Sequence, residues 1–213
     1  MPLPMVHLCT AREYAHDISA IINCPEFYLG SISPDAIHMR KDANWQNKRI
    51  THLHADGEHW KDNVLDFLRQ NKAKSNYKFL LGYGIHILTD ILWNETIYSE
   101  FKIKYERDSA PTQDITWAYY NDTDQLDFEL YKKIPWREEV WNLLEKAKPF
   151  DIDDILSAEE IKAWNERTLH WYDSGSSYHK HPIKYISYKD ITDFAQTAGK
   201  TIRNTLAEEG LSV

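Results

Sequence analysis

The sequence predicts an all-α protein, a single-domain bundle of several helices. Gly and Pro are few, with seven and eight among 213 residues, whereas aromatic residues are plentiful, with eight Trp and thirteen Tyr. This balance suits packed helices better than sheets joined by tight turns. Apolar residues recur at helical spacing in several segments, and no segment shows the alternation typical of strands. The chain is long enough to bury one sizeable core, so we treat residues 1–213 as one domain.

The N-terminal part of the chain predicts one helix followed by an irregular segment. Thr10 is a suitable N-cap for a helix that ends near Asn23, where Pro25 stops it. Residues 25–50 show no clean period. We therefore expect a structured loop there, with Pro34 and the residue after it fixing a turn.

The middle of the chain predicts two helices, one short and one long. An amphipathic helix spans about residues 58–70, with its apolar side chains on one side. Ser75 can cap the second helix, which continues to about Tyr105. The segment from Ser109 to Pro111 then breaks the chain.

Two further helical segments follow this break. The first reaches about Tyr131, and we expect an interruption at residues 121–124, where Asn-Asp-Thr-Asp is typical of a turn. The second begins at Pro135, because proline is favoured in the first helical position, and it ends near Lys148.

The C-terminal part of the chain predicts two helices with clear boundaries. Ser157 and Glu160 form a capping box at the start of the first helix. The last helix runs from about Tyr188 to Glu209 with a regular apolar face, and Gly210 ends it.

The segment between these two helices has a different composition. Residues 173–177 predict a flexible loop, and His179 and His181 follow it. These two histidines suit either a solvated loop or a lid over a functional site.

The most informative segment is the predicted helix over residues 79–93, which is apolar on nearly every face and therefore belongs inside the molecule. His86 and Asp90 lie four residues apart, so both side chains share one face, about 6 Å apart along the axis. Buried groups of this kind must be paired, hydrogen-bonded or ligated, because removing them from water is costly. A divalent metal would satisfy both residues; a direct His–Asp pair inside an ordinary core is the alternative.

Other segments before this helix carry further candidate ligands. They are an early His7, the turn Gly30-Ser-Ile-Ser-Pro-Asp35, and Thr51-His52. Together with His86-x-x-Thr-Asp90, their order and spacing resemble the zinc-dependent phospholipase C family, whose superfamily also contains zinc-dependent single-strand nucleases. The resemblance covers roughly residues 3–95.

The resemblance implies a metal site made of five residues: His7, Asp35, His52, His86 and Asp90. It also implies that Asp90 bridges two ions and that Asp35 is the base for the attacking water. Considered alone, Asp35 equally suits a helix cap or a turn, and a lone histidine near a terminus, such as His7, is usually exposed and inert. Of the neighbouring His52 and His54, the resemblance favours His52 as the ligand.

Some parts of the family's pattern are absent. The expected Pro and His after Asp90 are missing, since residues 91–96 read Ile-Leu-Trp-Asn-Glu-Thr. No later His-x-x-x-Glu occurs, although that region carries four carboxylates: Asp122, Asp124, Asp127 and Glu129. The family's metal-binding N-terminal amine has no counterpart, because we expect no cleaved signal sequence. We therefore predict one or two divalent ions rather than three, with zinc best suited to mixed His and carboxylate ligands and manganese or iron as alternatives.

These observations predict a metal-dependent hydrolase of a phosphoester, either a phosphodiesterase or a phospholipase C-like enzyme. A metal-activated water would attack phosphorus, and Asp35 would hold or deprotonate that water. The alternative is a catalytically reduced helical interaction module whose metal is structural or absent, which the missing ligands support. A third hypothesis, an HD-type phosphohydrolase, depends on the adjacent His16 and Asp17, which a surface pair explains more simply.

Charge and hydropathy limit the partners of the chain. With 25 basic and 33 acidic residues the net charge is −8, which opposes non-specific binding to nucleic acid. A small phosphoester substrate remains possible, because bound cations would supply the local positive charge. The N-terminal residues lack a basic region followed by a long apolar run, and no window of eighteen uncharged apolar residues occurs. We therefore expect a cytoplasmic protein without a transmembrane segment. The oligomeric state is left open.

Overall fold

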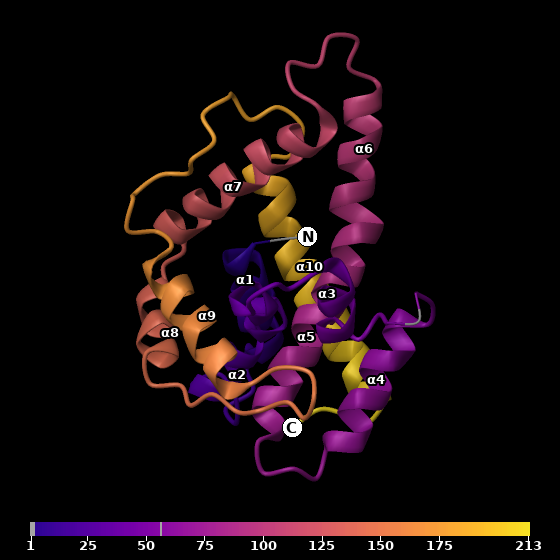
Figure 1. Cartoon of the computed structure of the whole chain (residues 1–213), viewed down its shortest axis with the longest axis vertical. Coiled ribbons are helices and arrows are strands. Elements are labelled where there is room, and N and C mark those ends of the chain that lie inside the picture. Colours follow the sequence, from indigo (N-terminus) through magenta and orange to yellow (C-terminus); the bar gives the residue numbers. More distant parts are fainter. Residues whose placement is uncertain (1–2, 56) are drawn as a thin grey trace.

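The computed structural model describes residues 3–55 and 57–213 as an all-helical protein (Figure 1), which confirms the predicted fold class. Within these ranges, extended pairing is limited to an isolated bridge between Ile152 and Leu156. The elements are, in chain order, α1 (Pro4–Ala15), α2 (Pro25–Gly30), the 3-10 helix η1 (Ser33–Met39), α3 (Trp45–Thr51), α4 (Trp60–Asn71), α5 (Tyr77–Trp93), the π-helical turn η2 (Asn94–Tyr98), α6 (Ser99–Glu106), α7 (Ile115–Lys133), α8 (Arg137–Leu144), α9 (Ala158–His170) and α10 (Tyr188–Glu208).

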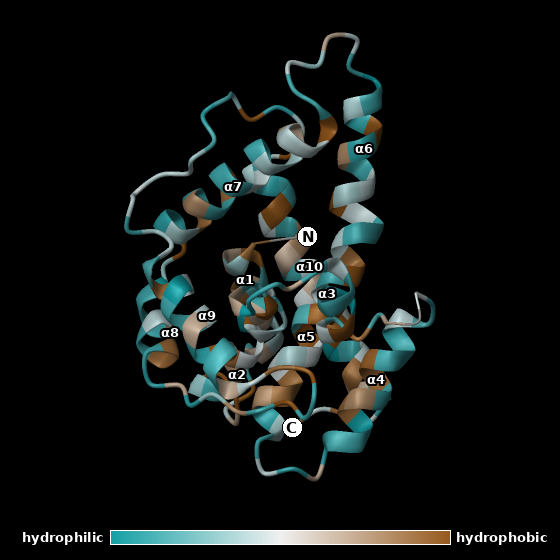
Figure 2. Ribbon diagram, viewed as in Figure 1, coloured by the Kyte–Doolittle hydropathy of each residue, from teal (hydrophilic) through white to brown (hydrophobic). Residues whose placement is uncertain are grey.

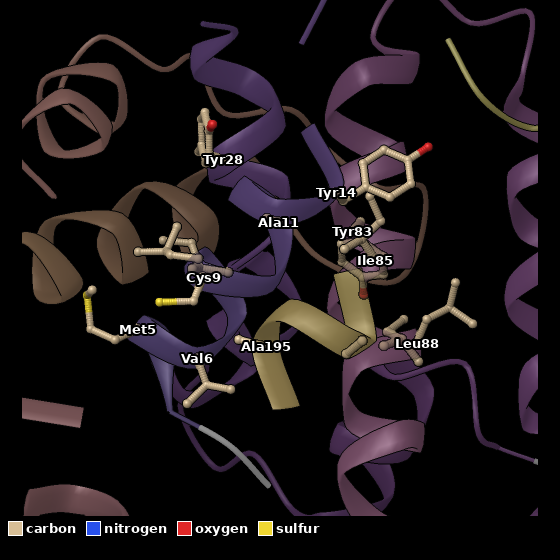
Figure 3. Packing of buried hydrophobic residues seen from close by; sticks show 14 of the residues in the cluster. Met5, Val6, Cys9, Ala11, Tyr14, Tyr28, Tyr83, Ile85, Leu88 and Ala195 are labelled. Carbon is tan, nitrogen blue, oxygen red and sulfur yellow. The ribbon is translucent and has the colours of Figure 1, made fainter. Parts of the chain in front are cut away.

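Helix α5 is the centre of the structure, as its apolar sequence predicts. Of its 17 residues, 14 are buried, and α1, α2, α4 and α10 pack against it. Figure 2 shows apolar residues concentrated on these inner helices, while polar residues cover the outer sides. Figure 3 shows core side chains from α1, α2, α5 and α10, among them Tyr14, Tyr28 and Ile85. His86 and Asp90 of α5 therefore lie where water is excluded.

Two glycines allow α2 and α5 to approach backbone to backbone. A Cβ atom on Gly30 would lie 2.0 Å from the carbonyl oxygen of Phe79, and one on Gly82 would lie 2.1 Å from that of Phe27. Such contacts are sterically forbidden, so only glycine fits at either position. The close approach brings η1, which follows α2 directly, against the middle of α5.

The first helix differs from its prediction. Its N-cap is Leu3 and not Thr10, so it begins at Pro4, and it ends at Ala15, where the chain turns through Asp17 at a φ of 65°. Proline suits the first helical turn because its missing N–H would be unpaired there in any case. The apolar residues after this point, such as Ile21, do reach the core, but from turns. Apolar spacing alone did not reveal where the helix ended.

The prediction of a structured loop over residues 25–50 is wrong, because α2, η1 and most of α3 lie in this range. Each contains six or seven residues, too few to display a helical period in the sequence. A local signal does exist for α3, since Asn44 and Asn47 form a reciprocal cap at its start. Packing against α5 and α9 supplies the remaining stabilisation for this region.

The long central helix continues past Trp93, as predicted, through the wide turn η2 into α6 (Figure 1). Its predicted cap at Ser75 is not formed; Asn76 occupies the N-cap position without a side-chain bond. Among the described residues, no helix combines the length and the apolar content that spanning a lipid bilayer requires.

The predicted interruption at residues 121–124 is also wrong, because α7 is continuous. The polar side chains there do not turn their own backbone. Asn121 and Asp122 accept hydrogen bonds from backbone N–H groups of residues 181–186, a segment that runs along α7. These side chains therefore hydrogen-bond to a distant backbone segment and do not form a turn in their own.

The last helices agree closely with their predictions. Helix α8 begins at Arg137, two residues after Pro135, and is shorter than expected. The capping box of Ser157 and Glu160 opens α9, and α10 ends just before Gly210, whose φ is +64°.

Candidate metal centre

The structure brings all five predicted ligands together in the interior. His7 lies on α1, Asp35 on η1, and His52 directly after α3, while His86 and Asp90 come from α5. Each is at most 8% exposed. Helix α1 supplies a ligand only because it begins at Pro4, and η1 supplies one only because α2 is held tightly against α5. The convergence therefore depends on the short helices that the sequence did not predict.

His52 and His86 each lie close to both carboxylates, those of Asp35 and Asp90. The Nε2 atom of His52 lies 3.5 Å from Asp35 Oδ1 and 3.4 Å from Asp90 Oδ2. The Nε2 atom of His86 lies 3.9 Å from Asp35 Oδ2 and 3.8 Å from Asp90 Oδ2. These separations exceed the usual length of a hydrogen bond, about 2.9 Å. No direct hydrogen bond therefore joins His86 and Asp90, although their side chains approach to within 3.8 Å.

The four separations are of the size found between ligands of one ion. Ligand atoms placed about 2.1 Å from one tetrahedral ion lie about 3.4 Å from each other. The observed separations of 3.4 to 3.9 Å are close to that value. The donor set of two imidazoles and two carboxylates suits zinc, and also manganese or iron.

His7 approaches the opposite oxygen of Asp90. Its Nε2 atom lies 3.7 Å from Asp90 Oδ1, and its ring stacks on that of His86 with centroids 3.6 Å apart. Among the described residues, two sets of potential ligands have atoms within 4.8 Å of one another: His7, His86 and Asp90, and Asp35, His52 and His86. One imidazole nitrogen binds one ion, so His86 can serve only one of these sets at a time.

Most polar atoms of this cluster have no hydrogen-bond partner among the described residues. They are both ring nitrogens of His7, His52 Nε2, His86 Nε2 and both carboxylate oxygens of Asp90. Asp35 Oδ1 has no hydrogen bond either, but the Lys48 ammonium lies 3.2 Å from it. A buried polar atom without a partner costs about 1–3 kcal/mol. A cation would satisfy these atoms together, which is the strongest structural argument for a metal centre.

Backbone carbonyl groups orient two of the imidazoles. His86 Nδ1 lies 2.9 Å from the carbonyl oxygen of Ser31, and His52 Nδ1 lies 2.9 Å from that of Lys48. A carbonyl oxygen only accepts, so in each neutral ring the proton is on Nδ1. The lone pair of each Nε2 then faces the cluster, as in most metal-binding histidines.

The electrostatics of the cluster favour a cation. Burial lowers the pKa of His86 to about 3, and burial together with the adjacent His86 lowers that of His7 well below its usual value. Burial raises the pKa of Asp90 to about 6. Burial acts in the same direction on Asp35, but the ammonium of Lys48 and the neighbouring His52 hold its pKa well below its usual range. At pH 7 these two imidazoles are therefore neutral and Asp35 is ionised, while burial works against the charge on Asp90.

Sequence reasoning missed the groups that surround Asp35. Lys48 Nζ lies 3.2 Å from Asp35 Oδ1, and His38 Nε2 lies 3.8 Å from the same oxygen. Both border a cavity of about 380 Å³ that opens beside Asp35 and is otherwise lined by Leu3, Pro4, Tyr120, Trp164, Arg167, Thr168 and Trp171. The available signal was the spacing of Lys48, four residues before His52, but no helix was predicted there.

The remaining histidines named in the sequence lie apart from this cluster. His54 stacks on Trp60 with ring centroids 4.4 Å apart. His16 pairs with Asp17 at 2.7 Å on the surface, which is the simple explanation that competed with the HD-type hypothesis. His179 pairs with Asp124 on α7 at 3.1 Å.

The later carboxylates also have other partners. Asp122 accepts hydrogen bonds from backbone N–H groups, as described above, and Asp127 accepts them from Met5 N–H and the hydroxyl of Tyr172. Glu129 pairs with Lys133. These residues stabilise the fold, so the structure assigns them no place among the candidate ligands.

Comparison with known protein families, curated proteins and solved structures finds no match for this chain. The resemblance to the zinc-dependent phospholipase C family is therefore carried by the five residues and their spacing alone. Any functional assignment must come from the geometry of the site.

Proposed function

We propose that this protein is a metal-dependent hydrolase of a phosphoester and that the five-residue cluster is its metal centre. One observation carries the proposal: buried imidazole nitrogens and carboxylate oxygens from four helical segments converge without hydrogen-bond partners among the described residues. Such a set is costly unless a cation completes it.

The residues divide naturally between two ions. Asp35, His52, His86 and one oxygen of Asp90 would hold the first, for which zinc is the best candidate. His7 and the other oxygen of Asp90 would contribute to a second, which has fewer protein ligands and would bind more weakly. A bridging role for Asp90 agrees with the role that the resemblance implies for it.

When bound, the metal supplies Lewis acidity and a nucleophilic water at neutral pH. The residues of the chain perform the other tasks. Asp35 is ionised with a lowered pKa, so its carboxylate would hold a metal ion and orient a nucleophilic water by accepting a hydrogen bond, and it would be a weak base towards that water. Lys48, 3.2 Å from Asp35, places a positive charge beside the phosphoryl oxygens of a bound ester.

The wider assignments belong to the same proposal. They are a fold of the zinc-dependent phospholipase C type, a small phosphoester as the substrate, one or two bound ions and a cytoplasmic location. The neutral imidazoles, the two carboxylates and the adjoining cavity support the enzymatic part of it.

Metal analysis tests the proposal directly. We expect purified protein to contain zinc or manganese and to hydrolyse chromogenic phosphoesters, with activity lost on chelation and restored by metal. Asp90→Asn should abolish both metal binding and activity, whereas Asp127→Asn, which changes a buried carboxylate outside the cluster, should keep both. A metal-free protein that shows no thermal shift with zinc or manganese would refute the proposal, as would full metal occupancy in Asp90→Asn.

An interaction module with a structural metal is the second candidate. It is favoured by the engagement of Asp122, Asp124 and Asp127 elsewhere, which leaves the later ligands of the family pattern without substitutes. Tight metal binding without hydrolysis of phosphomonoesters, phosphodiesters or short-chain phospholipids would support this candidate.

A further inference from the structure

One face of α9 forms a wall of the cavity beside Asp35. Trp164, Arg167, Thr168 and Trp171 all border this cavity, and their spacing of three, four and seven residues places them on the same side of the helix. A bidentate contact from Arg40 to Glu160, with distances of 2.6 and 3.0 Å, fastens α9 to η1. The wall is therefore held in place relative to Asp35.

Arg167 is positioned by aromatic rings and not by a carboxylate. Its guanidinium carbon lies 5.0 Å from the ring centroid of Trp164 and 4.7 Å from that of Trp171. Within the described parts of the chain the guanidinium has no hydrogen bond and no ion pair. Stacking on two indoles restrains the guanidinium while its N–H donors remain available.

The other polar residues of this wall also lack acceptors. The indole N–H of Trp164 and the hydroxyl of Thr168 have no hydrogen-bond partner among the described residues, although these residues are only 8% and 2% exposed. An indole N–H can only donate, and a buried donor without an acceptor is costly. Both atoms are closed off from solvent, so the donors that this face of α9 presents to the cavity are those of the Arg167 guanidinium.

The opposite side of the cavity adds a second cation. Lys48 contacts Asp35 at 3.2 Å and His38 Nε2 at 3.3 Å. Lys48 and Arg167 therefore border a cavity in which Asp35, a proposed metal ligand, is the one carboxylate among the described lining residues. Its volume of about 380 Å³ is within the usual range for a small-molecule site.

We propose that this cavity binds the dianionic phosphoryl group of a small phosphomonoester, with Arg167 and Lys48 contacting its oxygens. The planar guanidinium matches such an oxyanion in a bidentate manner, and the Lys48 ammonium adds a second positive charge beside it. Tyr120 and Trp171 offer exposed aromatic surface for the rest of the ligand. The assignment of this ligand as a substrate rests on the proposed hydrolase function; the binding of the anion does not.

Binding of inorganic phosphate to the full chain tests the inference, measured by calorimetric titration on chelated and on zinc-loaded protein. We expect binding in both states. Arg167→Gln should weaken it at least tenfold in both, and Arg167→Lys should weaken it less, because the charge remains but the planar fork is lost. Lys162→Gln is the matched control, since this exposed lysine is on α9, outside the cavity, and pairs only weakly with Glu166. It should leave binding unchanged.

Kinetics separate a binding role from a structural one. In the zinc-loaded protein Arg167→Gln should raise KM for 4-nitrophenyl phosphate more than it lowers kcat. Bis(4-nitrophenyl) phosphate, which carries one charge fewer, should be the poorer substrate and should respond less to the substitution. Preferential turnover of the diester would overturn the inference.

The two proposals fail in different ways. Metal binding without detectable phosphate binding, or with phosphate binding equal in wild type and Arg167→Gln, overturns the phosphate subsite alone. Phosphate binding that depends on Arg167 in a protein that takes up no metal supports the subsite and refutes the hydrolase.

Discussion

Buried carboxylates occur in two regions of this protein, and they differ in what surrounds them. Asp122 on α7 accepts hydrogen bonds from the backbone N–H groups of Tyr185 and Ile186 at 2.7 and 3.0 Å. Asp90 on α5 is equally buried, but it faces the lone pairs of imidazoles and has no hydrogen-bond partner among the described residues. The first carboxylate is surrounded by donors and the second by acceptors.

The difference shows why burial alone does not identify a metal site. A carboxylate that accepts backbone N–H bonds is already satisfied and fixes a segment of the chain. One surrounded by other acceptors needs a cation from outside the chain. The predictions below test this distinction, starting with the largest expected effect.

Replacing Asp122 by Ala should destabilise the protein most. The backbone N–H groups at residues 184–186 would lose their acceptor, and hydrogen bonds to a charged group contribute about 1.5–3 kcal/mol each. We expect a loss of about 3–5 kcal/mol in the free energy of unfolding. Urea denaturation measures it, and the loss should be the same with and without added zinc. A loss that disappears on chelation would show that Asp122 belongs to the metal site.

Removing the metal should lower the stability of the protein only when the five-residue cluster is intact. At a free zinc concentration about 1,000 times the Kd, binding stabilises the native state by about 4 kcal/mol. We therefore expect chelation to lower the Tm of the wild type and to leave that of Asp90→Asn unchanged. Thermal unfolding with a chelator, with zinc and with magnesium checks this, and equal shifts in wild type and variant would contradict it.

Asp127 should produce a pH dependence that its Asn variant lacks. Burial raises its pKa to about 7 in the folded protein, above its ordinary value near 3.8. The folded state therefore retains the proton more strongly than the unfolded state. Its contribution to stability is complete below about pH 4 and is lost as the pH rises towards 7, by up to about 4 kcal/mol at 1.36 kcal/mol per pKa unit.

Urea denaturation between pH 4 and 8 measures this contribution as the difference in the free energy of unfolding between wild type and Asp127→Asn. We expect the variant to gain stability relative to the wild type as the pH rises. Parallel curves over this range would show that Asp127 titrates normally.

The smallest change in stability is expected for Asp90→Asn in metal-free protein, and unlike Asp122→Ala this substitution should stabilise the fold. In chelated protein, Asp90→Asn removes a buried charge and supplies amide donors to a cluster made of acceptors. We expect this variant to be about 1 kcal/mol more stable than chelated wild type, which corresponds to a rise of about 2–4 °C in Tm. Differential scanning calorimetry in the presence of a chelator checks it. A lower Tm would show that the Asp90 carboxylate is already satisfied without metal.

Sequence reasoning succeeded where local signals were long or reciprocal. The capping box of Ser157 and Glu160 and the regular apolar face before Gly210 placed α9 and α10 closely. It failed for α2, η1 and α3, because helices of six or seven residues are stabilised by their neighbours and show no period of their own. It also placed the N-cap of the first helix seven residues late, at Thr10 and not at Leu3.

The candidate site divides in a similar way. His86 and Asp90 were found from their spacing on an apolar helix, and His7, Asp35 and His52 from a family resemblance. Lys48 and Arg167 were not found, because neither has a local pattern that distinguishes it from other surface cations. Their place beside Asp35 depends on how α3 and α9 pack.

From the sequence alone, the composition and apolar periods determined an all-helical class and a central helix that buries one imidazole and one carboxylate. Only the tertiary structure decided which other side chains share that interior. Packing without Cβ atoms at Gly30 and Gly82 brings η1 to α5, and a contact between distant segments leaves no periodic trace in either one. The same packing decided which buried carboxylates meet donors from the chain and which meet only acceptors.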